Sequence, residues 1–252
     1  MNDESPASLV LDEMTWVDVA AHLARDARLI IPIGALEQHG PNLPLGANTL
    51  IAARIAARLS AIWGVLRAPT VNYGINYDGG QVRPGRAWSG TASLRRKTMH
   101  RALNELLDSW ESNGIAEFIL ITAHRYGPHV DALTTLMTRS ARVRVVSVWD
   151  VDIADLLDTR SDPDHTGEPE TSVMLHLCPE RVSRVRPPVE LPGSSPDTDA
   201  SPPDLPKQDI PGAAAVLERA SAETGRLIVD RMLEVIGRAV FAARQTVDSD
   251  TL

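Results

Sequence analysis

The sequence has little of several residues on which common kinds of protein depend. It contains one cysteine, Cys178, which excludes an internal disulfide framework and a cysteine-based zinc cluster. Aromatic residues make up only 4% of the chain, and no apolar run approaches the ~18 residues of a membrane span. Cys178 lies in an apolar setting, which predicts a small buried side chain rather than a nucleophile.

Positive charge is also scarce. The formal net charge is −8 at pH 7 and the pI is about 5.4, which argues against nucleic acid or an anionic membrane as the main partner. The first residues, MNDESPASLVLDEM, lack the basic and apolar regions of a signal peptide. We therefore expect a cytoplasmic metabolic protein with a small-molecule substrate.

The chain alternates apolar runs with amphipathic helical patterns. This alternation predicts an α/β fold, a three-layer α/β/α arrangement with a mostly parallel central sheet. At 252 residues we expect one domain over 1–252, with a proline-rich excursion at about 186–211. The expected strands are 29–33, 65–71, 117–122 and 143–149, and the expected helices are 15–28, 50–63, 94–113, 131–141, 172–177 and 212–244.

The most informative stretch is LIIPIGALEQHGPNLPLGANT, residues 29–49. Its apolar start predicts a strand, and the following loop places Glu37 and His39 just beyond the strand end, where open α/β sheets carry their sites. His124 also follows an expected strand, and His165 and Glu170 lie in a later polar segment. Such a set of carboxylates and imidazoles suits Zn²⁺ or Mn²⁺.

Several motifs resemble those of the creatininase family. PIGALEQHGPNLPLGANT is similar to the family's PxGSxEQHGPHLPLxTD, and HTGEPETS resembles its HAGExETS. ITAHRYG stands where the family has a strand followed by NGHGGN or NGHYEN, WSGT at 88–91 is similar to FPGT, and ASAETGR resembles A-x-x-E-x-G. The match spans roughly residues 28–230 in the expected order, so the resemblance implies the creatininase-like fold.

The resemblance also implies residue roles. Family members hold two divalent metals and hydrolyse amide C–N bonds, in substrates from creatinine to formamides and small peptides. Glu37 and His124 match ligands of one metal. His39 matches a ligand of the other, where Glu170 would join it because the middle motif lacks a carboxylate. Asn48 matches the aspartate that bridges both metals. His165 matches the histidine proposed to handle protons at the leaving nitrogen, and Glu170 is a second catalytic candidate as a base.

Some positions depart from the family pattern. Asn48 offers a neutral oxygen where the family has a bridging carboxylate, which favours one metal per chain over two. Asn42 replaces a histidine at the rim of the expected site, and Arg125 and Tyr126 replace small residues beside His124. We therefore expect Asn42, Arg125 and Tyr126 to contact the substrate.

Several of these expectations have alternatives. Glu37 and His39 could instead be a hydrogen-bonded pair that orders the loop, and His165 and Glu170 could be the polar start of a helix. Arg125 could bind a substrate carboxylate or occupy the position of the missing metal's charge, or it could be a surface side chain turned to solvent. His129 and Asp78 are further polar candidates, for which a surface or capping role is expected.

The sequence thus leaves more than one function open. The first is a metal-dependent hydrolase of an amide-type C–N bond in a small nitrogenous metabolite or peptide-like substrate. The alternative is a divergent member without the dinuclear centre, acting as a metabolite-binding protein or as a biosynthetic enzyme with altered chemistry. The resemblance also implies a homo-oligomer, with a hexamer as the common form.

Overall fold

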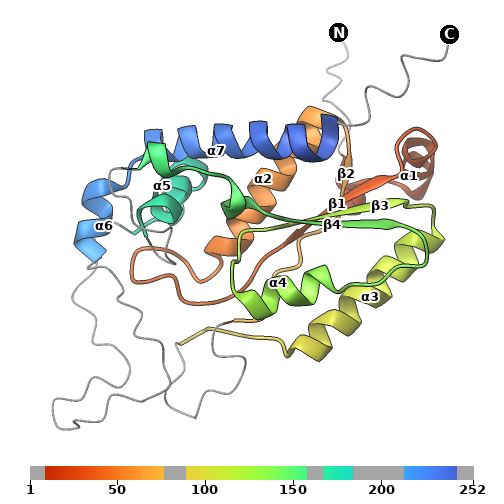
Figure 1. The fold of residues 1–252 in the computed structure, drawn as a ribbon, viewed down its shortest axis with the longest axis horizontal. Coiled ribbons are helices and arrows are strands. Elements are labelled where there is room, and N and C mark those ends of the chain that lie inside the picture. The colour runs from red at the N-terminus through yellow and green to blue at the C-terminus, as the bar shows by residue number, and fades with distance from the viewer. Residues whose placement is uncertain (1–8, 77–88, 158–166, 184–212, 243–252) are drawn as a thin grey trace.

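The structure is a computed structural model that describes residues 9–76, 89–157, 167–183 and 213–242. Its centre is a four-stranded sheet in the order β2-β1-β3-β4 (Figure 1). The strands are β1 (Arg28–Ile33), β2 (Leu66–Arg67), β3 (Glu117–Thr122) and β4 (Arg142–Ser147), and all neighbouring pairs are parallel. The predicted α/β fold with a parallel sheet is confirmed. The proline-rich excursion at 186–211 lies outside the described residues.

Helices cover both faces of the sheet (Figure 1). On one face lie α2 (Ala47–Trp63), α5 (Glu168–Leu177) and α7 (Ala222–Ile236), and on the other lie α3 (Arg96–Ser112) and α4 (Gly127–Thr134). The remaining helices are α1 (Trp16–Leu23), α6 (Ala213–Arg219), short 3₁₀ turns and a π-helical turn at Gly237–Phe241. None of the helices in these ranges is long and apolar enough to cross a membrane.

Successive side chains of β3 point alternately into the two cores on either side of the sheet. Ile119 and Ile121 of β3 point into the core beneath α2, α5 and α7, whereas Phe118 and Leu120 point into the core beneath α3 and α4. All four side chains are fully buried. Because successive side chains of a strand point to opposite faces, a run of apolar residues is what a sheet covered on both sides requires.

Several predicted helices differ from the observed ones at their ends or in their continuity; the predicted helix over 15–28, for example, is Trp16–Leu23, and that over 131–141 ends at Thr134. α4 begins at Gly127 rather than residue 131, and α5 begins at Glu168 rather than residue 172. Each has a proline in its first turn, where the missing N–H costs no hydrogen bond. The predicted helix over 212–244 is interrupted at Ala220 and Ser221, and the Ser221 side chain caps α7 by accepting from Thr224 N at 2.9 Å.

Gly225 of α7 is a close-packing position. A Cβ atom there would lie 1.9 Å from Ser172 O of α5, so only glycine lets these helix backbones approach. Ser221 N also donates to Ser172 Oγ at 3.1 Å. These contacts hold α5, which carries Glu168 and Glu170, in place on the sheet.

Candidate active site at the ends of two neighbouring strands

The candidate site lies where β1 and β3 end side by side. The register pairs Ile33, the last residue of β1, with Thr122, the last residue of β3. The loop after β1 carries Glu37 and His39, and His124 follows β3. All three side chains are buried, at 1 to 3% relative exposure. The strand register therefore brings together groups that are 85 or more residues apart in the chain.

The loop after β1 is held close to α2 by a glycine. A Cβ atom on Gly34 would lie 2.1 Å from Thr49 Oγ1, and the Gly34 N–H donates to Val71 O at 2.8 Å. Glu37 N donates to Leu45 O at 3.0 Å, which turns the loop back towards the helix. Asn48, in the first turn of α2, is thereby placed beside Glu37 with 1% of its surface exposed.

Glu37, Asn48 and His124 form a compact triangle. Asn48 Nδ2 donates to Glu37 Oε1 at 2.8 Å and lies 3.2 Å from His124 Nδ1. His124 Nδ1 lies 2.9 Å from the same Glu37 oxygen. On the other side of its ring, His124 Nε2 lies 2.8 Å from Ile75 O. Since a carbonyl oxygen only accepts, Nε2 carries a proton and Nδ1 faces Glu37 and Asn48.

This arrangement leaves one contact that requires positive charge. His124 Nδ1 cannot both donate to Glu37 and accept from Asn48. If it accepts, its lone pair faces a carboxylate oxygen at 2.9 Å, and such a contact is favourable only with a proton or a cation between the two atoms. The geometry thus calls for a positive charge at the point where Glu37 and His124 meet.

His39 approaches Glu37 from another direction. Its Nε2 lies 4.0 Å from Glu37 Oε1, while its Nδ1 lies 3.1 Å from Glu170 Oε2 of α5. Burial lowers the pKa of His39, but the attraction and hydrogen bond of Glu170 and the charge of Glu37 outweigh burial and raise this pKa above its usual value. Glu170 therefore holds a proton on Nδ1.

These residues fit one divalent cation by chemistry. Metal-binding histidines commonly donate their other ring nitrogen to a carbonyl or carboxylate, and His124 and His39 do so to Ile75 O and Glu170. Their inner nitrogens converge on Glu37, which gives the nitrogen and oxygen donors that Zn²⁺ or Mn²⁺ takes. Within the described ranges, however, no three His, Cys, Asp or Glu side chains have the spacing of a formed metal site.

The predicted substrate-binding residues take different positions. Asn42 is buried, and its carbonyl accepts from Ser183 N at 2.8 Å, which ties the loop to the end of the described segment after α5. Arg125 is exposed, and Tyr126 is half-buried with its ring centroid 6.1 Å from that of His124. The predicted catalytic residue His165 and the candidate Asp78 lie outside the described residues.

His129 is the residue whose importance the sequence did not reveal. A surface or capping role was expected, but the side chain is completely buried, with its ring centroid 4.7 Å from that of His124. Burial and the neighbouring His124 lower its pKa to about 3, so His129 is neutral at pH 7. The sequence signal that could have indicated this burial is the position of His129 in the first turn of the helix that follows β3.

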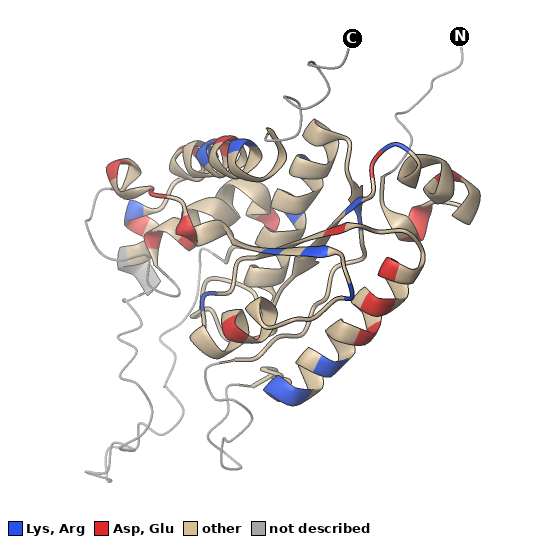
Figure 2. Cartoon of the chain, turned by 45° about the vertical axis from the view of Figure 1, so that its right-hand side comes forward, with Lys and Arg blue, Asp and Glu red and all other residues tan. Residues whose placement is uncertain are grey.

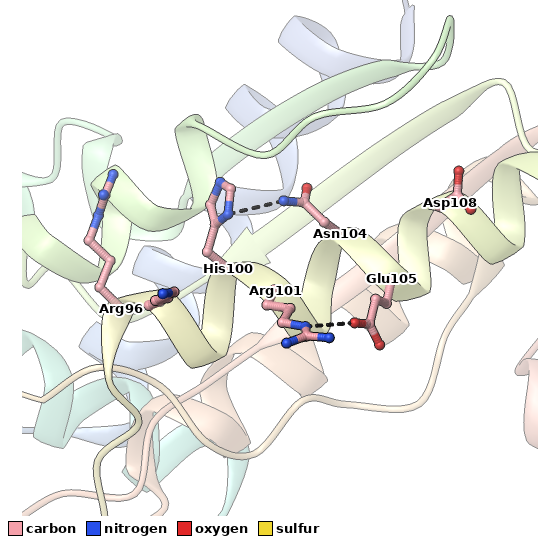
Figure 3. A pocket seen from close by; sticks show the side chains of 7 residues that line it. Arg96, His100, Arg101, Asn104, Glu105 and Asp108 are labelled. Atoms are coloured by element: carbon pink, nitrogen blue, oxygen red, sulfur yellow. Dashed lines mark hydrogen bonds and ion pairs between the residues drawn. The ribbon is translucent and has the colours of Figure 1, made fainter.

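A groove elsewhere on the surface is separate from this site. It runs along α3 with a volume of about 800 Å³, and Figure 3 shows its side chains pointing outward from the helix. Its described lining residues are Arg96, Lys97, His100, Arg101, Asn104, Glu105 and Asp108. Basic residues lie towards the N-terminal end of α3 and acidic residues towards its C-terminal end (Figure 2). None of the predicted site residues that the structure describes is among these lining residues.

The parallel sheet and the buried carboxylates and imidazoles at its strand ends agree with the resemblance to the creatininase family seen in the motifs. Residues 12–240 match the family model described as creatininase, creatinine amidohydrolase. The chain belongs to the creatininase family.

Individual relatives agree with this assignment. The chain is 27% identical to creatinine amidohydrolase from Pseudomonas putida, over 92% of this chain and 96% of that protein. It is 30% identical to mycofactocin precursor peptide peptidase from Mycolicibacterium smegmatis, over 61% of this chain and 59% of that protein. The resemblance seen in the motifs is confirmed.

Solved structures of creatininase share the fold. A tryptophan mutant matches with a TM-score of 0.73 and 26% identity, covering 93% of this chain and 99% of that one. A manganese form matches with a TM-score of 0.71 and 26% identity over the same shares of both chains. A zinc–zinc form of another mutant has a TM-score of 0.70 and 27% identity, covering 93% and 98%.

Proposed function

We propose that this chain hydrolyses an amide-type C–N bond in a small nitrogenous metabolite or peptide-like substrate, with the help of one divalent metal ion, Zn²⁺ or Mn²⁺. The observation that carries this proposal is the position of Glu37. Its Oε1 lies 2.9 Å from His124 Nδ1 and 4.0 Å from His39 Nε2, and the far nitrogen of each ring is hydrogen-bonded to an acceptor. The manganese and zinc–zinc forms of related structures support the choice of metals.

Glu37, His39 and His124 would hold the metal, and Asn48 could add its amide oxygen after a half-turn of the amide group. The chemistry that such a cation supplies is polarisation of the amide carbonyl and a lowered pKa for a coordinated water. One metal is favoured over two because Asn48 brings no negative charge to compensate a second dication.

The protein groups around these ligands control protons and ring orientation. Glu170 keeps a proton on His39 Nδ1, and Ile75 O keeps a proton on His124 Nε2, so both inner nitrogens remain available as donors of lone pairs. Glu170, whose carboxylate lies 3.1 Å from His39 Nδ1, is also the candidate base. In the reaction the carbonyl carbon gains a hydroxyl, the C–N bond breaks, and the leaving nitrogen gains a proton, a step that we assign to His165.

Metal analysis of the purified protein tests the proposal. We expect about one equivalent of Zn or Mn per chain, and loss of amide hydrolysis after chelation with recovery on adding the metal back. The substrate panel should contain cyclic amides such as creatinine, together with formamides and short peptides. Metal-free protein whose hydrolysis of these amides is unaffected by chelators would contradict the proposal.

Matched variants locate the site. Glu37→Gln keeps the shape of the side chain but removes the charge, so we expect it to lose both metal and activity. Glu105→Gln is the control, because Glu105 is exposed on α3 and pairs only with Arg101 at 3.0 Å among the contacts observed. It should retain the metal content and turnover of the unmodified protein.

One observation favours the alternative function. The Asn48 amide satisfies Glu37 and His124 with its own N–H groups, at 2.8 and 3.2 Å, so a metal must displace hydrogen bonds that already exist. A divergent member could use this closed arrangement to bind a metabolite or to carry out a biosynthetic step. In that case the purified protein would contain no metal, and chelators would not reduce the activity of the unmodified protein or of Glu37→Gln.

A further inference from the structure

We propose that His129 is a positioning residue that fixes the ring of His124 and thereby strengthens metal binding at the candidate site. This inference rests on the proposed function, and nothing in the sequence motifs assigns a role to His129. It is carried by two hydrogen-bonding partners that His129 and His124 share, the backbone of Ile75 and the hydroxyl of Thr122.

The first shared partner is Ile75. Ile75 N donates to His129 Nδ1 at 3.3 Å, while Ile75 O accepts from His124 Nε2 at 2.8 Å. The two histidines therefore bind the same residue, His129 through the N–H of Ile75 and His124 through its C=O. Any displacement of His129 moves the carbonyl that determines which nitrogen of His124 is protonated.

The second shared partner is Thr122, the last residue of β3. Because Nδ1 of His129 accepts a hydrogen bond, its proton is on Nε2, which lies 3.2 Å from Thr122 Oγ1. The backbone N–H of His124 donates to the same oxygen at 3.1 Å. His129 is thus attached both to the strand end that holds the His124 backbone and to the loop whose carbonyl holds Nε2 of the His124 ring.

Packing leaves His129 little freedom. A Cβ atom on Gly74 would lie 2.8 Å from both Cε1 and Nδ1 of His129 and 2.7 Å from Gly34 O. The next residue but one, Asn76, is tied by its side-chain amide to Leu36 O at 2.9 Å and Ala92 O at 3.0 Å. The segment around Ile75 is therefore clamped between His129 and the loop that carries Glu37.

A ring that only filled space could be replaced by a carbon ring of similar size. His129→Phe keeps that volume but removes both hydrogen bonds, whereas His129→Gln can accept from Ile75 N with its oxygen and donate to Thr122 with its nitrogen. Comparing the two variants separates packing from hydrogen bonding.

The test measures Zn²⁺ affinity by competition with a chromophoric chelator. We expect His129→Phe to weaken Zn²⁺ binding about 10-fold, the lower range for outer partners of metal-binding histidines, and His129→Gln to recover most of the loss. Glu105→Gln, exposed on α3, is the control and should bind Zn²⁺ like the unmodified protein. A folded His129→Phe protein with unchanged Zn²⁺ affinity would overturn the inference.

Two further measurements keep the inference testable. If His129→Phe does not fold, Thr122→Val removes the shared hydroxyl at nearly constant volume, and we expect a smaller loss of Zn²⁺ affinity. If the unmodified protein binds no metal, the proposed function fails, but the inference can still be judged by ¹⁵N NMR of the imidazoles. The His124 ring should then show a single tautomer protonated at Nε2, and this preference should weaken in His129→Phe or Thr122→Val; an unchanged tautomer would contradict the positioning role.

Discussion

Asn48 Nδ2 donates to Glu37 Oε1 at 2.8 Å, so the site is closed by a hydrogen bond at the position that the family motif gives to an aspartate. An amide can donate there, and a carboxylate cannot. The same amide nitrogen lies 3.2 Å from His124 Nδ1. Asn48 therefore couples the loop after β1 to the residue after β3 through its side-chain amide.

Replacing Asn48 by aspartate should change the number of metals. In Asn48→Asp the new carboxylate would face Glu37, and two carboxylates at this spacing repel each other unless a cation or proton lies between them. We expect the metal content to rise from about one to about two equivalents per chain, measured by elemental analysis after dialysis against Zn²⁺ or Mn²⁺. Asn104→Asp, in the groove along α3, should leave the metal content unchanged.

The metal-free form of Asn48→Asp gives a second, independent result. Without a cation, repulsion from Glu37 should lower the free energy of unfolding at pH 7 relative to the metal-free parent, and added metal should reverse the loss. If the variant bound no additional metal and unfolded like the parent, Asn48 would not be the residue that limits the metal count.

Gly225 should not tolerate a side chain. In Gly225→Ala the methyl group would meet the backbone of Ser172, whose oxygen would be 1.9 Å away, so α5 and α7 must separate. We expect a loss of about 3 kcal/mol in the free energy of unfolding, the upper range for overpacking, measured by urea denaturation. Gly127→Ala is the matched control, because no atom lies within 4 Å of a Cβ there, and it should fold with unchanged or slightly greater stability.

Glu111 predicts how stability depends on acid. Its carboxylate accepts from the backbone N–H groups of Arg139, Ser140 and Ala141, and these bonds lower its pKa to about 2. A lowered folded-state pKa means that the stabilisation is present above the unfolded value of 4.5 and is lost as pH falls towards 2. Glu111→Gln should therefore be less stable than the parent at pH 7, and the difference should shrink below pH 4.5, as measured by urea denaturation across pH.

Much of the fold could be predicted because its determinants are local. The apolar runs at 29–33 and 117–122 are the strands β1 and β3, and their burial on both faces explains why they do not alternate with polar residues. Helix starts were harder to predict. Pro128 and Pro169 lie inside the first turns of α4 and α5, and a proline there can indicate either a loop or a helix start.

The sequence predicted which residues lie in the candidate site better than it predicted the contacts between them. Glu37, His39, His124 and Glu170 do meet, because parallel strands place their ends at one edge of the sheet. The sequence could not indicate that Asn48 would donate to Glu37, or that His129 would be buried against His124, since both depend on distances between separate segments. The roles of these residues and the expected homo-oligomer remain predictions.

Arg125 offers a test of substrate class. It is exposed and follows His124 in the chain, and a guanidinium there could bind a substrate carboxylate through two hydrogen bonds. We expect Arg125→Gln to raise KM by about 10- to 100-fold for amides that carry a carboxylate, the effect of losing a hydrogen bond to a charged group, with little change for neutral amides. Arg101→Gln, in the exposed groove on α3, should change neither value. Because the proposed metal ligands are unchanged in Arg125→Gln, its metal content and kcat should stay close to those of the parent. An equal rise in KM for charged and neutral amides would mean that Arg125 shapes the site without recognising a carboxylate.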